Sequence, residues 1–311
     1  MRVAAIDVGT NTTRLLVAEL GSGGGYRELD RRLVFTRLGE RVDASRRLQP
    51  DAIERTIGAI AGFCAIAGEL GAQRLRLAGT SALRDAANRE EFIEAASRVI
   101  GGDPEILSGA REAELSFAGA TRDLGAGRYL ITDIGGGSTE LVAGHPGGAQ
   151  GAGAVEEAVS LDIGSVRLTE RHLRSDPPSD QELGVLETNI DQALEEVEMK
   201  IHRTSPTRLV GVAGTVTSLA AMRLGLEAHD PVRTHGLTLE REELTRLYRG
   251  LAHMTTQQRR KIPALPSGRA DVIVAGASIL VRIMARWSFS EVICSEKDIL
   301  DGLVLEMARA G

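Results

Sequence analysis

The chain has 311 residues, of which 42% are hydrophobic, 26% charged and only 3% aromatic, and its formal net charge at pH 7 is −6. This length predicts two domains of about 150 residues each. The acidic balance excludes a general nucleic-acid-binding protein, because a broad basic face is missing, but it allows a polyanionic substrate held by a few arginines.

The first half alternates predicted strands and helices, as judged from apolar periodicity and from the glycines, prolines and capping residues between them. Asn88 is predicted to cap a helix, with Glu91 in the capping-box position. The predicted elements of this half are, in chain order, strand 3–6 with a second strand after it, strand 27–41, helix 51–70, strand 75–78, the helix after Asn88, a short strand ending at 106–107, and helix 110–124.

The second half repeats the alternation of strands and helices, which indicates an α/β fold. Residues 147–153 are predicted to form a flexible loop, and 271–287 is a nearly all-apolar helix that we expect to be buried between layers. The other predicted elements are strand 129–131 with its hairpin partner, strand 155–161, helix 167–173, the longest helix 180–202, strand 208–212 opening into a helix at 213–218, strand 291–294 and helix 298–309.

A hairpin built around three glycines is the central feature of the sequence. The stretch Asp133-Ile-Gly-Gly-Gly-Ser-Thr-Glu140 joins two apolar strands. Glycines let the backbone approach an anion closely, and the successive N–H groups of such a turn form a nest of donors. Asp133 and Glu140 are candidate ligands of a divalent metal, since hard cations bind carboxylate oxygens. The candidates for binding phosphate are Gly135, Gly136, Gly137 and Ser138.

The chain contains this hairpin twice. Asp7-Val-Gly-Thr-Asn-Thr-Thr-Arg14 aligns without gaps to the stretch that ends at Glu140. The repeat predicts two related domains, each with an anion-binding loop, although a hairpin without any ligand is the alternative for either stretch alone. Where the first copy has Arg14, the second has Glu140, so we expect one loop to hold phosphate by charge and the other through a metal. The first copy adds Gly9, Thr10, Asn11, Thr12 and Arg14 as candidates for phosphate and Asp7 as a candidate metal ligand.

Two further segments carry side chains suited to phosphate chemistry. Arg84 follows a predicted strand directly, so its planar guanidinium would project from a strand end and bind phosphate oxygens in pairs. A surface ion pair with Asp85 is the alternative. Glu112 and Glu114 begin a predicted helix, where glutamates can simply stabilise the helix N-terminus. Glu112 can equally act as a general base for water.

Two glycine turns at strand ends are further candidates for contact with an anion. Gly214 and Thr215 follow strand 208–212 and open a helix, where backbone N–H groups can bind an anion. Gly164 and Arg167 form a similar turn after strand 155–161. No Ser/His/Asp or Cys/His nucleophile set stands out among the histidines.

Taken in order, these motifs resemble the exopolyphosphatase / guanosine pentaphosphate phosphohydrolase family in its short two-domain form, over essentially the whole chain. The resemblance implies two related actin-like domains (ribonuclease H-like, as in sugar kinases and heat-shock ATPases) around a central cleft, with 1–124 and 299–311 in the first and 125–298 in the second. The matching motifs are Asp7-x-Gly-x-Asn-x-x-Arg14-Leu, Thr80-Ser-Ala-x-Arg84-Asp-Ala-x-Asn88, Ser108-Gly-x-x-Glu112-Ala, Asp133-Ile-Gly-Gly-Gly-Ser-Thr-Glu140 and Ala213-Gly-Thr215.

The resemblance also implies roles for single residues. It makes Glu112 the catalytic base and Arg84 the phosphate clamp. It makes Asp133 and Glu140 the carboxylates that bind metal and water, and the backbone of 135–138 the second phosphate loop.

Three positions depart from the family pattern. The first loop has Gly9-Thr-Asn-Thr where Gly-Ser-Asn-Ser is usual, which keeps the hydroxyls. Arg111-Glu112 stands where two glutamates are usual and leaves one carboxylate. Leu300-Asp301-Gly302 stands where Arg-Glu-Gly is usual, which puts in doubt a phosphate contact from the last helix.

Together these inferences predict a phosphohydrolase that uses Mg²⁺, or Mn²⁺ in its place, to release terminal orthophosphate from inorganic polyphosphate. Glu112 would deprotonate the attacking water, while Arg84, Arg14 and the loop amides offset charge on the phosphoryl oxygens. The alternatives are guanosine pentaphosphate as substrate, a non-catalytic sensor of polyphosphate or guanosine tetraphosphate, and an ATP-dependent kinase of the same fold. The kinase is disfavoured because no adenosine-pocket motif is found. Longer relatives continue into a helical domain, so we expect long chains to be gripped less processively here, and we expect a homodimer.

The cysteines and the N-terminal residues give information about the cellular location of the protein. Cys64 and Cys294 lie far apart in apolar surroundings, with neither metal-site spacing nor a disulfide framework, which predicts reduced thiols. The first strand begins within two residues of Met1, so no signal-peptide pattern is visible. No apolar run reaches the ~20 residues that a membrane span needs. We therefore expect a cytoplasmic protein with neither membrane nor nucleic acid as a partner.

Overall fold

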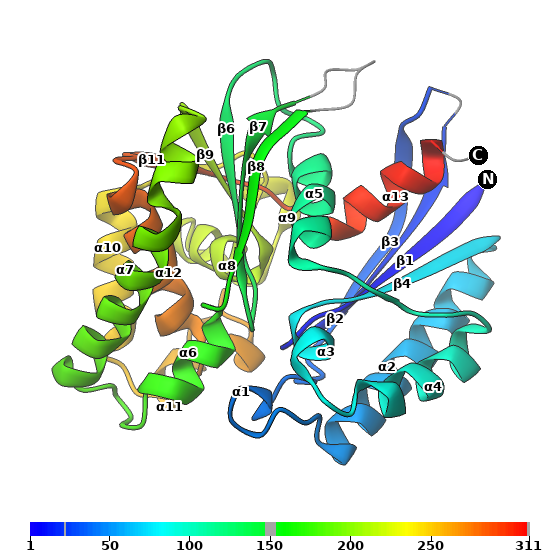
Figure 1. Ribbon diagram of the computed structural model, residues 1–311, viewed down its shortest axis with the longest axis horizontal. Coiled ribbons are helices and arrows are strands. Elements are labelled where there is room, and N and C mark those ends of the chain that lie inside the picture. The colour runs from blue at the N-terminus through cyan, green and yellow to red at the C-terminus, as the bar shows by residue number, and fades with distance from the viewer. Residues whose placement is uncertain (22, 147–153, 310–311) are drawn as a thin grey trace. The chain divides into compact units, whose positions relative to one another are not determined.

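A computed structural model describes residues 1–21, 23–146 and 154–309, and the chain divides into two compact units (Figure 1). The first unit comprises Met1–Gly119 with Asp298–Gly311, and the second comprises Ala120–Lys297. The sequence prediction placed the boundaries after residue 124 and before residue 299. The flexible loop predicted at 147–153 lies outside the described residues.

The strands of the first unit form one mixed sheet. They are β1 Arg2–Val8, β2 Thr13–Leu20, β3 Tyr26–Val34, β4 Arg74–Gly79 and β5 Glu105–Ile106. Their order is β3-β2-β1-β4-β5, and β1 pairs antiparallel with β2 and parallel with β4. Both faces of β1 are buried, which explains why it is a continuous apolar run rather than an alternating one.

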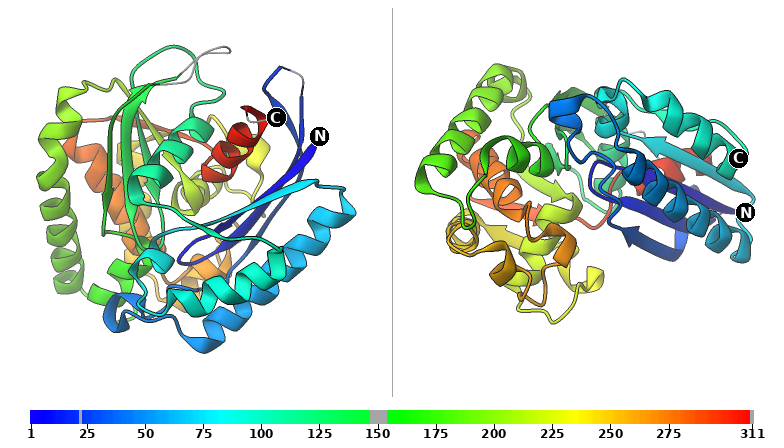
Figure 2. Two further views of the ribbon diagram at one scale, coloured as in Figure 1. Left: turned by 45° about the vertical axis from the view of Figure 1, so that its right-hand side comes forward. Right: turned by 90° about the horizontal axis from the view of Figure 1, so that it is seen from below.

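Helices cover both faces of this sheet. They are α1 Val42–Ser45, α2 Pro50–Glu69, α3 Ser81–Asp85, α4 Arg89–Ile100, α5 Gly109–Ala120 and α13 Ile299–Arg309. On one face, Ile6 of β1 packs in a cluster with Phe63 of α2 and Phe92 of α4. On the other face, Ala5 packs in a cluster with residues of α5 and α13, such as Leu303. Figures 1 and 2 show the pair α2–α4 and the pair α5–α13 on opposite sides of the strands.

The second unit has a larger mixed sheet with its own helices. Its strands are β6 Tyr129–Ile134, β7 Thr139–His145, β8 Ala154–Leu161, β9 Arg208–Val212, β10 Thr238–Glu240 and β11 Glu291–Cys294, in the order β10-β11-β9-β6-β7-β8. Its helices are α6 Ser165–His172, α7 Asp180–Arg203, α8 Ala213–Arg223, α9 Pro231–Thr234, α10 Arg241–Ala252, α11 Thr256–Arg259, the 3₁₀ turn η1 Ser267–Arg269 and α12 Ile273–Arg286.

The two sheets repeat one topology. The order β3-β2-β1-β4-β5 in the first unit corresponds to β8-β7-β6-β9-β11 in the second, and β6 pairs antiparallel with β7 and parallel with β9 as β1 does with β2 and β4. The hairpin registers correspond as well, because Asp7 lies opposite Arg14 and Asp133 lies opposite Glu140. The predicted α/β class and the duplicated hairpin are therefore confirmed.

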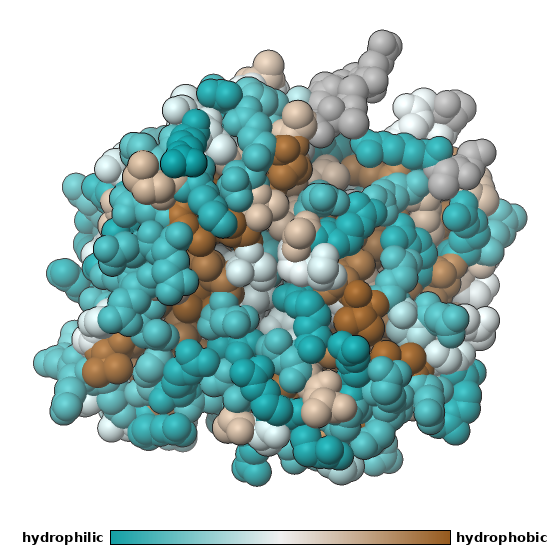
Figure 3. All heavy atoms as spheres, in the orientation of Figure 1, coloured by the Kyte–Doolittle hydropathy of each residue, from teal (hydrophilic) through white to brown (hydrophobic). Residues whose placement is uncertain are grey.

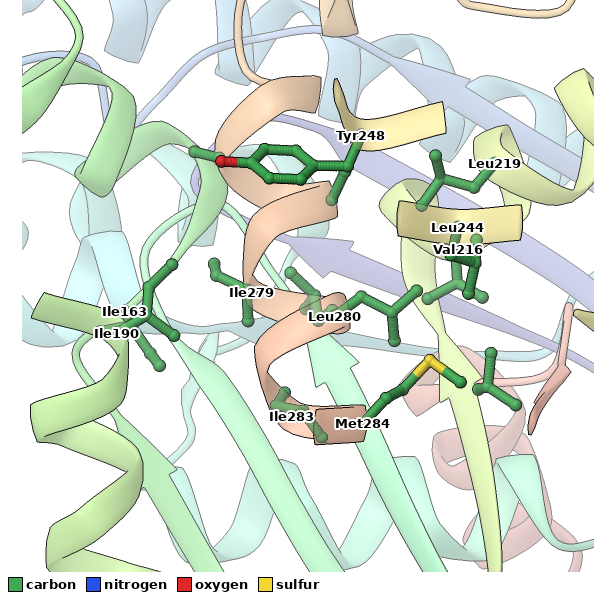
Figure 4. Close-up of a cluster of buried hydrophobic side chains, with 14 of the residues drawn as sticks. Ile163, Ile190, Val216, Leu219, Leu244, Tyr248, Ile279, Leu280, Ile283 and Met284 are labelled. Atoms are coloured by element: carbon green, nitrogen blue, oxygen red, sulfur yellow. The ribbon is translucent and has the colours of Figure 1, made fainter. Parts of the chain in front are cut away.

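Helix α12 forms the centre of the core in the second unit, as its apolar sequence predicts. It packs against α6, α7, α8 and α10. Figure 4 shows Ile279, Leu280 and Met284 of α12 among side chains such as Ile190 of α7 and Val216 of α8. A helix that is apolar nearly all round is stable in water only when other elements surround it.

One face of the molecular surface is drawn in Figure 3. The face drawn in Figure 3 is mainly hydrophilic, with hydrophobic residues scattered among the polar ones. In the part of the chain that the structure describes, no helix combines the length and the apolarity needed to cross a membrane.

Several local predictions are wrong. The strand predicted over 27–41 ends at Val34, and the helix predicted to reach residue 124 ends at Ala120. Asn88 does not cap α4 with its side chain. Its Oδ1 instead accepts from Leu48 N at 2.8 Å and its Nδ2 donates to Leu48 O at 3.2 Å, so a backbone partner distant in sequence replaces the local one. No prediction was made for β10 and α10.

The start of α7 carries a capping box that makes stability depend on pH. The Glu182 carboxylate accepts hydrogen bonds from Ser179 N at 2.8 Å, Arg174 N at 2.8 Å and Ser175 N at 2.9 Å. These bonds, the one from Ser179 first, lower the pKa of Glu182 from its ordinary 4.5 to about 2. Because the folded-state pKa is the lower one, this group stabilises the folded protein above pH 4.5, and the stabilisation is lost as the pH falls towards 2.

We therefore expect Glu182→Gln to reduce the pH dependence of the free energy of unfolding between pH 4.5 and about 2. Urea unfolding at a series of pH values measures this. Glu195→Gln, at an exposed position of the same helix, is the matched control and should leave the profile of the natural protein unchanged. Identical profiles for Glu182→Gln and the natural protein would contradict the assignment.

Candidate active site

The first predicted phosphate loop is the turn between β1 and β2. Gly9 N donates to Thr12 O at 2.9 Å, which closes the turn. Two other carbonyls of the loop are bound by the segment after β3, since Asn11 O accepts from Arg37 N at 3.0 Å and Thr10 O accepts from a second amide there. These bonds satisfy carbonyl oxygens that would otherwise repel an anion bound to the N–H groups of the turn.

The second loop, between β6 and β7, is closed in the same way, because Gly135 N donates to Ser138 O at 3.0 Å. Its carbonyls are bound by the start of α6: Ser165 N donates to Gly135 O at 2.9 Å and Val166 N donates to Gly136 O at 2.9 Å. The two loops therefore share one geometry. In each loop the carbonyls accept hydrogen bonds from the segment that follows the next strand, β3 in the first unit and β8 in the second.

Two residues beside the second loop hold its backbone in shape rather than provide further contacts to an anion. Gly164 allows the close approach of α6, because a Cβ there would lie 2.3 Å from Gly136 O. Arg167, in the turn predicted to meet an anion, is 5% exposed and donates from Nε to Gly137 O at 2.6 Å. We infer that this arginine holds the loop in shape.

The two acidic residues of the second hairpin, Asp133 and Glu140, lie opposite each other on β6 and β7. Both are buried, with 8% and 1% of their surfaces exposed. Oε1 of Glu140 accepts from Ser138 Oγ at 2.8 Å and from Ser160 Oγ at 2.7 Å. Because the hydroxyl proton of Ser138 is donated to Glu140, the predicted phosphate contact of Ser138 would be made by its backbone N–H.

In the first hairpin, Arg14 connects two buried carboxylates. It donates from Nε at 3.0 Å and from Nη2 at 2.6 Å to Oδ2 of Asp7, and from Nη1 to Oδ2 of Asp298. A phosphate would therefore compete with both carboxylates for this guanidinium. Asp7 Oδ1 is buried and has no hydrogen-bond partner. Burial raises the pKa of Asp7 above its ordinary value, against the opposing effect of Arg14.

Arg84 and Glu112, the predicted clamp and the predicted base, form an ion pair. Arg84 donates from Nη1 to Oε2 of Glu112 and also, at 3.1 Å, to Leu107 O. Arg84 lies in the one-turn helix α3 and not at the strand end that was predicted. Glu112 is in the first turn of α5 and is 9% exposed. The structure thus brings together the predicted base and the predicted clamp, and it orients the carboxylate.

Arg269 of η1, which the sequence interpretation missed, lies against the start of α8. Gly214 lies so close to Arg269 that a Cβ on the glycine would be 2.1 Å from Cζ of the arginine. Arg269 donates from Nη1 to Ser218 Oγ at 3.0 Å. Thr215, the other predicted anion contact, is 5% exposed. A guanidinium beside a helix N-terminus adds a second positive group where an anion was predicted.

The last helix begins in a buried polar network. Asp298 Oδ1 accepts from Leu300 N at 3.0 Å, and Asp301 Oδ2 accepts from Asp298 N at 2.9 Å, so the two aspartates cap α13. Asp301 Oδ1 accepts from Arg31 Nη2 at 2.9 Å and from the hydroxyl of Tyr26. Asp301, one of the departures from the family pattern, is fully buried and acts as a structural residue.

The departure at Arg111 also has a structural explanation. Its guanidinium pairs with Glu114 of the same helix at 3.0 Å and with Glu306 of α13. The charge of Arg111 is therefore balanced by carboxylates other than Glu112, and Glu114 takes part in this ion pair.

The carboxylates suit a hard divalent cation in their chemistry. Within the described ranges, no three His, Cys, Asp or Glu side chains are grouped so that they could hold a metal ion. Mg²⁺, however, usually keeps several waters and binds one or two carboxylates together with the phosphates of a substrate. The pair Asp133 and Glu140, and the orphaned buried Oδ1 of Asp7, fit that donor chemistry.

Comparison with known proteins bears out the resemblance seen in the sequence. The description "Ppx/GppA phosphatase family" belongs to a family model that matches residues 16–310. The chain is 38% identical to exopolyphosphatase 2 of Mycobacterium tuberculosis over 99% of this chain and 98% of that protein. It is 29% identical to guanosine-5'-triphosphate,3'-diphosphate pyrophosphatase of Vibrio atlanticus, over 98% of this chain and 59% of that protein.

A solved structure agrees with these sequence relatives. The crystal structure of an exopolyphosphatase-like protein superposes with a TM-score of 0.92 at 37% identity, covering 99% of this chain and 98% of the other. The duplicated hairpin, the Arg84–Glu112 pair and the full-length matches lead to one conclusion: the chain belongs to the Ppx/GppA phosphatase family.

Proposed function

We propose that this chain is an exopolyphosphatase, which releases terminal orthophosphate from inorganic polyphosphate. The observation that carries the proposal is the 38% identity to exopolyphosphatase 2 across nearly the whole of both chains. The composition supports it, because polyphosphate offers only phosphates to bind. With three Tyr, five Phe and one Trp, the chain has few aromatic side chains on which a guanine base could stack.

We assign Glu112 as the general base. It would take a proton from water as the water oxygen attacks the terminal phosphorus and the bond to the bridging oxygen breaks, so that the shortened chain leaves with that oxygen and its electron pair. Arg84 would orient Glu112 and bind a phosphoryl oxygen. In each unit the N–H groups of the glycine loop would bind phosphate oxygens, and in the second unit those of Gly214 and Thr215 would do so as well.

We assign Arg14 a positioning role, because Asp7 and Asp298 already bind its guanidinium. It would fix Asp7 so that the orphaned Oδ1 is available to a cation or to a water molecule. In the second unit Asp133 and Glu140 would be metal ligands, and Ser138 and Ser160 would hold Glu140 in place. A divalent metal, implied by the family and proposed here to be Mg²⁺ with Mn²⁺ as substitute, would neutralise charge on the phosphate oxygens.

Activity should therefore require Mg²⁺ or Mn²⁺ and should be lost in excess chelator. Asp133→Asn should raise the Mg²⁺ concentration for half-maximal activity at least tenfold, because a neutral amide oxygen binds a hard cation more weakly than a carboxylate. Isothermal titration of Mg²⁺ gives a readout independent of turnover. The matched control is Asp180→Asn, at an exposed position of the same unit. Full activity of the natural protein in excess EDTA would remove Asp133 from the mechanism.

The test of the proposed substrate is a comparison of kcat/KM for polyphosphates of increasing length with that for guanosine pentaphosphate. All substrates should be measured at one salt concentration, because charge-driven binding is screened. We expect polyphosphate to be preferred. A tenfold preference for the nucleotide, ~1.4 kcal/mol in transition-state binding, would reverse the assignment. Binding without turnover would indicate a sensor, and transfer of phosphate to ADP would indicate a kinase.

The expected homodimer is a further proposal. Sedimentation equilibrium over a range of protein concentrations would test it, and a single monomeric species at every concentration would reject it.

A further inference from the structure

The second unit contains a cavity that lies apart from the candidate active site. We call it the α8–α10 pocket, because it is lined by the end of α8 with the turn after it, by α10 and by residues 262–264. Its volume is ≈ 550 Å³, and small-molecule sites usually have about 300–1,000 Å³. Gly214, a predicted anion contact, lies at the start of α8, and Arg223, which lines the pocket, lies at its end. The length of the helix between them separates the two sites by roughly 15 Å.

The floor of the α8–α10 pocket is apolar and belongs to the core. Leu251 of α10 is 3% exposed and packs in the main core cluster of the unit, while Leu226 and Ala264 pack in a smaller cluster. The lining also includes apolar side chains that solvent reaches, namely Met222, Leu247, Met254 and Ile262. Such a surface favours a ligand with an apolar body, because binding removes both apolar surfaces from water.

A glycine inside α10 keeps part of the α8–α10 pocket open. A Cβ on Gly250 would meet no neighbouring atom within 4 Å, and the residue has an ordinary helical backbone. Neither packing nor backbone conformation requires glycine here, although glycine makes a helix less stable than alanine does. Open space kept at this cost beside an apolar floor favours a site that a ligand fills.

Four charged side chains line the α8–α10 pocket, and two of them satisfy each other. Arg223 at the end of α8 donates to Glu243 of α10 at 2.7 Å. The hydrogen bond from Arg223, and to a smaller extent the charge of Arg246, lower the pKa of Glu243. The carboxylate of Glu243 is therefore already occupied by an arginine.

The other two charges have no such partner. Among the described residues, neither Arg246 of α10 nor Glu227 in the turn after α8 makes a hydrogen bond or an ion pair, and both are exposed. Glu227 follows the C-terminus of α8, whose carbonyls carry negative partial charge, so a positive group is favoured there. The guanidinium of Arg246 favours a carboxylate. The α8–α10 pocket thus offers one negative group and one positive group beside an apolar floor.

We propose that the α8–α10 pocket binds a zwitterionic ligand with an apolar body, which is the chemistry of a short apolar peptide. The carboxylate of the ligand would pair with Arg246 and its ammonium group with Glu227. Its apolar side chains would lie against Leu226 and Leu251, in the space beside Gly250. The binding is non-covalent and does not depend on the proposed hydrolysis of polyphosphate.

Calorimetric titration of the natural protein with the dipeptide leucylleucine tests this site. We expect saturable binding with a Kd of about 1 mM or tighter. Glycylglycine keeps both charges but lacks the apolar body, so it should bind at least about tenfold more weakly. N-Acetyl-leucylleucine lacks the ammonium group and leucylleucine amide lacks the carboxylate. Each should bind about two- to fivefold more weakly than leucylleucine, as expected for the loss of one exposed ion pair.

Gly250→Leu tests the pocket itself. The leucine side chain would fill the space beside the floor, so binding of leucylleucine should weaken at least about tenfold. Leucine also forms helices better than glycine, so urea unfolding should show a folded variant at least as stable as the natural protein. Gly184→Leu is the matched control, because Gly184 is an exposed glycine of α7 with equally open space around it. Unchanged binding by folded Gly250→Leu would overturn the site.

Charge variants test how the ligand is oriented. Arg246→Gln should weaken leucylleucine about two- to fivefold and leave the amide, which has no carboxylate, unaffected. Glu227→Gln should weaken leucylleucine likewise and leave the N-acetyl derivative unaffected. Arg249→Gln removes an exposed charge of α10 outside the lining and should bind as the natural protein does.

The outcomes decide the proposal whatever the protein does to polyphosphate. Absence of leucylleucine binding to the natural protein, or equal binding of glycylglycine, would reject the proposed ligand. If Arg246→Gln weakened the amide as much as leucylleucine, the pairing of carboxylate and guanidinium would be wrong. None of these titrations needs hydrolysis of polyphosphate, so failure of the proposed function would leave their result unchanged.

Discussion

Glu112→Gln is expected to lower kcat for polyphosphate by about 10²–10⁴ while leaving the affinity for polyphosphate nearly unchanged. The amide has the size of the carboxylate but cannot accept the proton of the attacking water. Single-turnover phosphate release measures the first effect, and calorimetric titration with tripolyphosphate measures the second.

Glu114→Gln is the matched control for this variant. Glu114 lies in the same helix, and its ion pair is with Arg111 at 3.0 Å and not with Arg84. It should keep the activity of the natural protein. If Glu112→Gln keeps more than about half of the activity, Glu112 is only a carboxylate at a helix start and the general-base assignment is wrong.

Gly302→Ala is expected to destabilise the first unit by at least about 1–3 kcal/mol. The added methyl group would meet backbone atoms, which cannot move aside as a flexible side chain can. Helices α5 and α13 are neighbours in Figure 1, and they approach each other at Gly119 and Gly302. A Cβ on Gly302 would lie 2.1 Å from Leu115 O, and one on Gly119 would lie 1.9 Å from Asp298 O. The methyl group would push α13 away and displace Asp298, which holds Arg14.

Urea unfolding measures this loss, and Gly58→Ala is the control. Gly58 lies within α2 with open space around its Cα, so alanine there should stabilise the protein by up to ~1 kcal/mol through helix propensity. Equal stabilities for Gly302→Ala and the natural protein would show that α5 and α13 do not need their close approach. Activity should fall with stability in Gly302→Ala, since Arg14 and Asp7 depend on Asp298 for their placement.

The sequence predicted correctly those features of the fold that a local sequence pattern determines. The aligned hairpins predicted two related units, and the structure places Asp7 opposite Arg14 and Asp133 opposite Glu140 in the same register. The apolar run of α12 predicted a buried helix, because a helix that is apolar nearly all round must be surrounded by other elements.

Interactions between residues distant in sequence were not predictable in this way. Asn88 has the residue type and spacing of a helix cap, but its side chain binds the backbone of Leu48. Asp298 holds Arg14 although 284 positions separate them. Arg269 lies against Gly214, and Ser160 orients Glu140, with no local motif that marks either one. The tertiary fold decides which side chains position a given group. No short pattern in a single sequence indicates such contacts.

Some missed features did carry a usable signal. Leu244, Tyr248 and Leu251 recur at the spacing of a buried helical face and could have revealed α10. The left-handed backbone conformations of Arg41 and Arg46, at the two ends of α1, could not have been found, since nothing in the residue type arginine indicates a positive φ.

The most direct test of the central claim is hydrolysis of polyphosphate by the purified chain with Mg²⁺ in water enriched in ¹⁸O. The account predicts orthophosphate as the product, one ¹⁸O atom in each phosphate released in the first turnover, and almost no release by Glu112→Gln. Absence of orthophosphate would contradict the proposed function, and release of phosphate that carries no oxygen from the solvent would contradict attack of water on the terminal phosphorus.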